Sequence, residues 1–201
     1  MTIYTIGHST RSLEELIAAL GGHGITTLVD IRSFPMSRRM PYFNRESLEV
    51  ELPEHGIAYV WLKELGGRRK KILKDSPNTA LRNESFRNYA DFMITEEFAG
   101  GIARLLELAG DTAGPSTRIG NFARSSLRMT PEEGRQGGTA IMCAERVYFQ
   151  CHRMLVSDYL TAHGHTVLHI DDEKRPVRKH TLMAEARLVD GKLVYESGRL
   201  L

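Results

Sequence analysis

Two cysteines and their neighbours form the segment of this sequence with the clearest chemical potential. Cys143 ends the apolar run TAIMC, and Cys151 precedes His152 and Arg153 at the start of a helical pattern. A helix N-terminus carries free backbone N–H groups and partial positive charge, so it attracts anions and lowers the pKa of a nearby thiol. Arg153 would add a bidentate donor for phosphate or carboxylate. The pattern predicts that Cys143 is a thiol nucleophile. The competing interpretation is that Cys143 is a buried residue with only a structural role.

Other classes of cysteine site fit the spacing less well. A cysteine phosphatase loop has an arginine six residues after its cysteine, and Phe149 occupies that position. A structural zinc site usually shows Cys-x-x-Cys or regularly spaced histidines, and neither spacing occurs here. The residues that could still gather around a metal are Cys143, Cys151, His152 and His8. A metal-thiolate protein therefore stays as a third hypothesis, although we predict no metal site and no cofactor.

Polar residues also follow two other apolar runs. His8 and Ser9 come directly after a glycine, and Asp30 and Arg32 lie two positions apart. His8 titrates near neutrality and could serve as a general acid or base, or only hydrogen-bond locally. Asp30 and Arg32 would share one face of an extended strand. There they could pair with each other, orient His8 or hold an anion.

Three further sets of residues complete the candidate inventory. Gly66 and Gly67 could present backbone N–H groups to a phosphate. Glu145 follows Cys143 closely and is a candidate acid or base, and Tyr59 lies in an apolar run. His169 lies at the end of the last predicted strand of the sheet. Five other histidines fall at helix ends or in loops, and we predict that they lie at the surface: His23, His55, His163, His165 and His180.

The elements that must position these residues alternate between strand and helix. The predicted strands cover residues 2–7, 26–31, 57–62, 139–143 and 166–170. The predicted helices cover residues 12–22, 44–56, 83–109 and 149–162. The second could start at Asn44 or at Ser47, and the third has a break near Thr95 or Gly100. Ser12 and Glu15 form a capping-box pattern, and Asp190-Gly191 predicts a hairpin over 188–195.

This alternation predicts an α/β fold, with a mainly parallel sheet flanked by helices in a Rossmann-like sandwich and a C-terminal hairpin. In such sheets ligands bind at the carboxyl ends of the strands. The candidate residues follow those ends, so we expect them to converge there.

Composition bounds the class of protein. The chain has 201 residues, 41% hydrophobic and 26% charged, and a net charge of +2. These values predict one globular α/β domain over residues 1–201, with residues 110–138 as a flexible insertion. Two cysteines, no leader-like start and no apolar run of about 20 residues predict a cytoplasmic protein without a membrane partner.

Two functional hypotheses of different classes follow. The first is an enzyme acting on a small anionic substrate or nucleic acid: a nucleotide, nucleic acid or phosphorylated metabolite. Cys143 would be the nucleophile or ligand, Glu145 or His8 the acid/base, and Arg32 and Arg153 the anion clamp. The alternative is a non-catalytic nucleic-acid-binding module built on the basic segments 31–45 and 63–87, with Tyr42, Phe43 and Trp61. The sequence does not define the substrate, the reaction or the oligomeric state.

The motifs in their order resemble the domain of unknown function 488 family, which is bacterial and archaeal. They are TIGHS (5–9), LVDIRSFP (28–35), Tyr59, LGGR (65–68), MCAE (142–145), CHR (151–153) and HI (169–170). The resemblance spans residues 2–170, and relatives usually lack the long 110–138 segment. It implies a shared α/β domain, an unassigned biochemistry loosely tied to DNA repair, and a pocket lined by the matching positions. Those positions are His8, Ser9, Asp30, Arg32, Tyr59, Gly66, Gly67, Cys143, Glu145, Cys151, His152 and Arg153.

Overall fold

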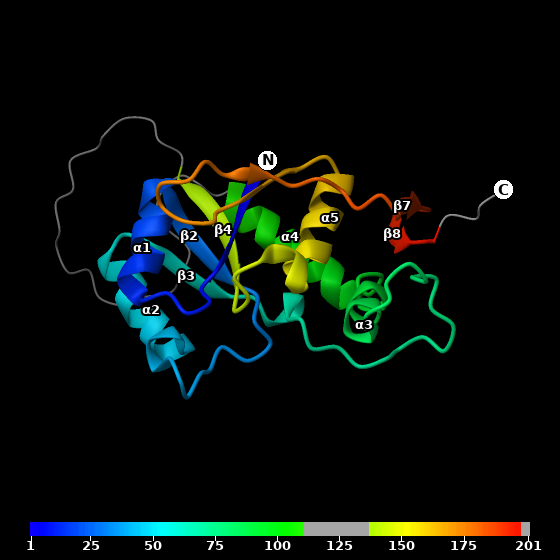
Figure 1. Ribbon diagram of the computed structural model, residues 1–201, viewed down its shortest axis with the longest axis horizontal. Coiled ribbons are helices and arrows are strands. Elements are labelled where there is room, and N and C mark those ends of the chain that lie inside the picture. Colours follow the sequence, from blue (N-terminus) through cyan, green and yellow to red (C-terminus); the bar gives the residue numbers. More distant parts are fainter. Residues whose placement is uncertain (111–136, 198–201) are drawn as a thin grey trace.

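A six-stranded sheet with the order β3-β2-β4-β1-β5-β6 organises the molecule (Figure 1). The computed structural model describes residues 1–110 and 137–197. The strands are β1 (Thr2–Gly7), β2 (Ile25–Asp30), β3 (Ala58–Trp61), β4 (Gly138–Cys143), β5 (Thr166–His169) and β6 (Arg178–Lys179). The first five pair in parallel, and only β6 runs antiparallel, against β5. The predicted α/β fold with a mainly parallel sheet is confirmed.

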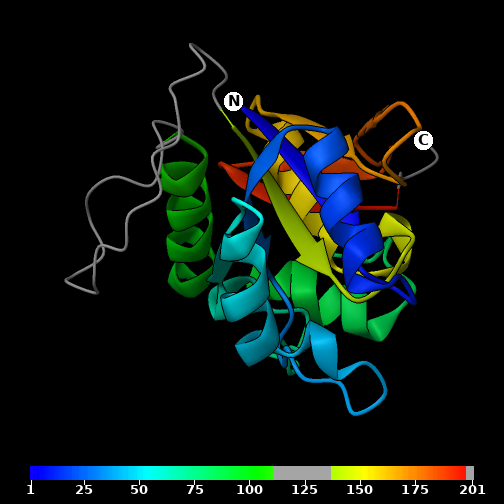
Figure 2. The same ribbon diagram turned by 90° about the vertical axis from the view of Figure 1, so that its left-hand side faces the viewer.

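Helices cover both faces of this sheet. On one face, α1 (Leu13–Gly22) and α2 (Arg45–Glu54) bury leucines against β1, β2 and β4. On the other face lie α3 (Glu84–Phe92), α4 (Glu96–Gly110) and α5 (Arg153–Ala162). Figure 2 shows α1 and α4 on opposite sides of β4. Because both faces are covered, most residues of the central strands β1, β2 and β4 are buried, as in other parallel sheets.

Local signals set the helix boundaries. The capping box is present, since Ser12 Oγ accepts from the Glu15 N–H and the Glu15 carboxylate accepts from the Ser12 N–H. The predicted break near Thr95 separates α3 from α4, and Gly100 lies inside α4. A Cβ on its neighbour Gly101 would come 2.8 Å from the Leu65 side chain. That glycine therefore serves close packing and does not end the helix.

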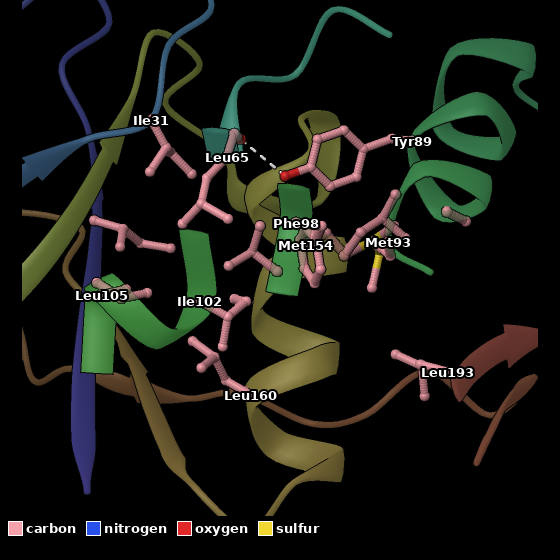
Figure 3. Close-up of a cluster of buried hydrophobic side chains, with 14 of the residues drawn as sticks. Ile31, Leu65, Tyr89, Met93, Phe98, Ile102, Leu105, Met154, Leu160 and Leu193 are labelled. Carbon is pink, nitrogen blue, oxygen red and sulfur yellow. Dashed lines mark hydrogen bonds between the residues drawn. The ribbon is translucent and has the colours of Figure 1, made fainter. Parts of the chain in front are cut away.

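The end of α3 is anchored to the loop after β3. Figure 3 shows the Tyr89 hydroxyl donating to the Leu65 carbonyl oxygen, 2.8 Å away, among apolar side chains of α4 and α5. Tyr89 is fully buried, and its ring lies 5.1 Å from that of His152. This contact fixes one wall around the start of α5.

The predicted helix over 149–162 is shorter than its pattern suggested. A 3-10 turn spans Tyr148–Gln150, and α5 begins only at Arg153. Cys151 has an extended backbone between the two. The thiol of Cys151 therefore sits immediately before the helix N-terminus, close to the end of β4.

The C-terminal part contains the predicted hairpin. β7 (Ala186–Val189) pairs with β8 (Lys192–Tyr195) through Asp190 and Gly191, both with positive φ, as this tight turn requires. The hairpin lies beside α3 in Figure 1. Of the predicted insertion, Gly110 belongs to α4 and Gly138 to β4, while 111–136 lies outside the described residues. Among described helices, none combines the length and apolar character needed to cross a membrane.

Candidate functional site

The carboxyl ends of β1, β2 and β4 meet at the centre of the sheet. The His8 N–H donates to the Cys143 carbonyl (3.0 Å), and the Ser9 N–H donates to the Ala144 carbonyl (2.8 Å). β1 and β4 are neighbours in the sheet, but the connection from β1 to β2 and the connection from β4 to β5 run in opposite directions along it. Ligands of open α/β sheets bind where neighbouring strands have connections that run in opposite directions. Two groups of predicted residues gather there.

The first group is the cysteine cluster, which consists of Cys143, Cys151, His152 and Arg153. His152 Nε2 lies 3.0 Å from the Ile31 carbonyl oxygen. Because a carbonyl only accepts, this bond assigns the proton to Nε2 and leaves the Nδ1 lone pair free. Nδ1 faces Cys143 Sγ at 3.8 Å. The imidazole is therefore oriented to take a proton from the thiol.

Gly67 allows the loop after β3 to lie against this imidazole. A Cβ at Gly67 would come 2.4 Å from His152 Nδ1, which is far inside contact distance. Gly66 is similarly close to the Ser33 hydroxyl, which accepts a hydrogen bond from the Arg68 N–H. The glycine pair thus permits close packing around the cluster.

Arg153 is the largest fully buried side chain of the described residues, 1% exposed. Its Nε and its backbone N–H donate to Cys151 Sγ (3.3 and 3.4 Å). The rest of the guanidinium contacts the Glu145 carbonyl, the Arg146 carbonyl (3.2 Å) and the Thr5 hydroxyl (3.5 Å). Within the described residues it contacts no carboxylate. Its Nε is therefore directed at Cys151 Sγ, and no acid among the described residues neutralises its charge.

These surroundings separate the two thiols. A hydrogen bond from Cys151 and the nearby Arg153 charge, aided by the backbone N–H groups of Glu145 and Ala144, outweigh burial and lower the pKa of Cys143 to about 7. Sharing its proton with Cys143, together with burial, raises the pKa of Cys151 to about 12. The pair therefore loses its first proton near neutrality, at Cys143.

The second group is the aspartate cluster, which consists of His8, Asp30, Arg32 and Tyr59. Arg32 Nε lies 2.9 Å from both oxygens of Asp30, which is fully buried. The Tyr59 hydroxyl donates to Asp30 Oδ2 at 2.7 Å. Burial and the negative charge of Asp30 raise the pKa of Tyr59. The ion pair expected for Asp30 and Arg32 is present, and it occupies most of the Arg32 guanidinium.

His8 completes the aspartate cluster. Its Nδ1 lies 3.1 Å from the Ser9 carbonyl, so Nδ1 carries the proton, and Nε2 accepts from Arg32 Nη1 at 3.2 Å. Burial, with the adjacent Arg32 charge, lowers the pKa of His8 to about 4. Asp30 and Arg32 thus orient a neutral His8. In this state its basic nitrogen is already engaged.

The remaining predicted residues lie at the rim. Glu145 is exposed and contacts the cysteine cluster through its backbone carbonyl and N–H. Ser9 is half-buried with φ 50°, a conformation that residues other than glycine seldom adopt. A hollow of about 470 Å³ lies elsewhere, and Lys71, Lys74 and Asp91 are among the residues that line it.

Sequence reasoning placed His169 at the end of the fifth strand, but it missed the buried hydrogen-bond chain to which His169 belongs. Thr5 Oγ1 contacts His169 Nδ1 (2.8 Å), His169 Nε2 contacts His180 Nδ1 (2.9 Å), and His180 Nε2 contacts Asp158 (2.8 Å). His180 is 4% exposed, so its predicted surface position was wrong. The reason is the antiparallel β6, after which the His180 N–H bonds to the Val167 carbonyl of β5. Two-residue strands leave no periodic signal.

Arg11 was also missed as part of this edge. It is buried and donates to the carbonyl oxygens of Gly7 and Asp171. Burial and the nearby charges of Arg146 and Arg153 lower its pKa. Three arginines therefore gather near the end of β1.

The chemistry available to the cysteine cluster is nucleophilic or ligating. Sγ of Cys143, Sγ of Cys151 and a ring nitrogen of His152 lie within 4.8 Å of one another, a set that a soft metal ion could use. The buried cation of Arg153 opposes a second positive charge at this point. A single thiolate, in contrast, would be neutralised by Arg153.

The comparisons with known proteins reach the family level. A family model described as domain of unknown function DUF488 matches residues 12–114, about half of the chain. The matched stretch includes Asp30, Arg32, Tyr59 and the glycine pair, and it ends before Cys143. Neither the curated proteins nor the solved structures gave a match.

Proposed function

The chain belongs to the DUF488 family, and from this premise we propose that it is an enzyme that uses Cys143 as a nucleophile on an anionic substrate. The observation that carries the proposal is the pairing of Cys143 Sγ with the unprotonated Nδ1 of His152 beside a buried arginine. A thiol with an adjacent base, itself oriented by a third group, is the arrangement that covalent catalysis uses.

In this proposal His152 is the acid/base in place of Glu145 or His8. Nδ1 of His152 accepts the Cys143 proton, and the Ile31 carbonyl keeps the ring in the required tautomer. The His8 nitrogen that would act as a base already accepts from Arg32. The N–H groups of Ala144 and Glu145 would stabilise negative charge on the sulfur or on an adjacent oxyanion.

The charge around the cluster supports an anionic substrate. Arg32 is neutralised by Asp30, so it contributes little free positive charge. Arg146 and Arg153 lie near enough to Arg11 to repel it, although Glu15 and Asp171 attract it, and Arg146 is exposed. A nucleotide, nucleic acid or phosphorylated metabolite would relieve that repulsion on binding. We therefore propose Arg11 and Arg146, in place of Arg32, as the residues that hold the anion together with Arg153.

The test is the alkylation rate of Cys143 against pH with two reagents, neutral iodoacetamide and anionic iodoacetate, followed by peptide mass. We expect the Cys143 rate to rise through a pKa near 7, against about 8.5 for a free cysteine. We also expect the ratio of iodoacetate to iodoacetamide rates to exceed that of a free cysteine peptide. Cys151→Ser is the matched control that removes the second thiol.

Two results would overturn the proposal. One is a Cys143 that titrates like a free thiol in both the native chain and Cys151→Ser. The other is a Cys143 that reacts quickly but has a lower ratio of iodoacetate to iodoacetamide rates than a free cysteine peptide. That result would contradict the proposal that the substrate is an anion. His152→Gln should slow alkylation near pH 7 if His152 is the base.

A second candidate function rests on a separate observation. The basic segments 31–45 and 63–87 lie side by side, because the Arg68 N–H donates to Ser33 and its guanidinium lies 5.5 Å from the Phe34 ring. Phe34 is 66% exposed, whereas Phe43 is fully buried and offers no stacking surface. Binding of single-stranded nucleic acid through this surface should weaken steeply as salt rises. An affinity that is indifferent to salt would exclude it.

A further inference from the structure

Cys151 has no role in the nucleophilic step proposed above, yet it faces the nucleophile directly. Both cysteines are free, each is 6% exposed, and their Sγ atoms lie within 4.8 Å of each other. Cys143 ends β4, and Cys151 precedes α5. The loop between them starts with exposed residues, Ala144 to Arg146. The two thiols therefore form a pair under a short surface loop.

The two sulfur atoms are held in different ways. Cys143 Sγ faces the basic nitrogen of His152, whereas Cys151 Sγ accepts two N–H bonds from Arg153. In a dithiol of this kind, one sulfur attacks the substrate disulfide, and the second sulfur then attacks the mixed disulfide that forms on the first. Cys151 keeps its proton while Cys143 is free, because its hydrogen bond to Cys143, together with burial, raises the pKa of Cys151; reaction of Cys143 removes the first of these two causes.

We propose that Cys143 and Cys151 form a redox-active dithiol that reduces small anionic disulfides. The proposal rests on the nucleophilic Cys143 of the proposed function and names a substrate class for it. The arginines near the end of β1 supply the preference for negative charge on the substrate. Reduction of the disulfide consumes the dithiol and leaves a Cys143–Cys151 bond in the protein.

The reaction has two exchange steps. In the first, Cys143 gives its proton to His152, its sulfur attacks the substrate disulfide, and the S–S bond breaks. One substrate thiol leaves with that proton, and the other half stays on Cys143 as a mixed disulfide. In the second, Cys151 gives its proton to His152 and attacks the Cys143 sulfur, and the remaining substrate thiol leaves with the proton. Two electrons pass from the dithiol to the substrate, and no other reactant is needed.

The experiment uses the reduced full chain and oxidised glutathione, an anionic disulfide, without oxygen. For the native chain we expect the mass to fall by two hydrogen atoms, with release of two glutathione thiols and a Cys143–Cys151 peptide. Cys151→Ser should stop at one glutathione attached to Cys143. Cys143→Ser should give neither product. Cystamine, a cationic disulfide, is the matched probe and should react more slowly relative to its rate with free cysteine.

The outcomes separate this inference from the proposed function. If the native chain keeps one stable glutathione on Cys143, or does not react while iodoacetate still modifies Cys143 quickly, the dithiol is wrong and the nucleophile stands. If Cys143 reacts with neither reagent, both fail. Cys151→Ala should trap the same glutathione adduct on Cys143, and it carries no hydroxyl in place of the thiol. A failure to trap in both folded variants overturns the assignment of Cys151.

Discussion

Two buried arginines, at the ends of neighbouring strands, have opposite electrostatic surroundings. Arg32 follows β2 and pairs with the Asp30 carboxylate, which also accepts from Tyr59. Arg153 begins α5, next to the end of β4, and donates only to carbonyl, hydroxyl and sulfur atoms. Both are almost fully buried, at 6% and 1% exposed. Burial of an arginine alone therefore does not identify an anion site.

The partner of each cation separates structure from reactivity. A buried cation with a bidentate carboxylate is neutral as a pair, and its removal mainly affects folding. A buried cation beside thiols stabilises the thiolate, so its removal should mainly affect chemistry. Under the proposed function, the aspartate cluster has a positioning role and the cysteine cluster is where the reaction takes place.

The largest effect should come from Asp30→Asn. The substitution leaves Arg32 buried without its carboxylate, which typically costs about 3–5 kcal/mol of unfolding free energy. Denaturant unfolding at neutral pH measures the loss. The double variant Asp30→Asn, Arg32→Met is the control and should recover part of it. A loss below about 1 kcal/mol would mean that Arg32 finds another partner or water.

Acid should weaken the same cluster. The pKa of His8 is about 4 in the fold against 6.5 ordinarily, so the unfolded chain binds this proton more readily. Stability therefore falls as pH drops from about 6.5 to about 4, by roughly 3 kcal/mol from this residue alone. Across that range, the free energy of unfolding, measured at a series of pH values, should change less with pH for His8→Gln than for the native chain. Burial lowers the pKa of His169 to about 3. Protonation of His169 would therefore leave some pH dependence of stability in His8→Gln.

Arg153→Met should have a smaller effect, on reactivity. Loss of the cation raises the pKa of Cys143, and one pKa unit would cut its alkylation rate at pH 7 by up to about tenfold. Arg153→Lys keeps the charge and is the matched control. A pH profile that is the same in Arg153→Met and the native chain would contradict the distinction between the two arginines.

The smallest effect should come from Glu145→Gln. Its carboxylate is exposed, and only its backbone contacts the cluster, so the Cys143 alkylation rate should change by less than about twofold. Glu145→Pro removes the N–H and should raise the pKa of Cys143. A tenfold loss in Glu145→Gln would restore the carboxylate as the acid or base.

Local patterns predicted most of the fold. The capping box at Ser12, the break at Thr95 and the hairpin turn at Asp190 were all read from neighbouring residues, and all are present. The start of α5 was misplaced because its apolar spacing continues backward through the 3-10 turn. β6 could not be predicted, because a strand of two residues has no period.

The candidate site was predictable only in part. The rule that ligands bind at the carboxyl ends of parallel strands selected both clusters from the sequence. It did not separate Arg32 from Arg153, and it named His8 and Glu145 as acid or base, where we now propose His152. It also missed Arg11 and His180, which are buried by contacts with distant segments.

The sequence by itself determined which residues end the strands, because strand and helix periodicity and capping are local. Tertiary structure alone decided which of those residues lie together and which charges are compensated. His152 has its basic nitrogen toward Cys143 because its other nitrogen bonds to the carbonyl of Ile31, 121 residues away. Charge compensation and proton position depend on distances between such remote segments, and those distances exist only in the folded chain.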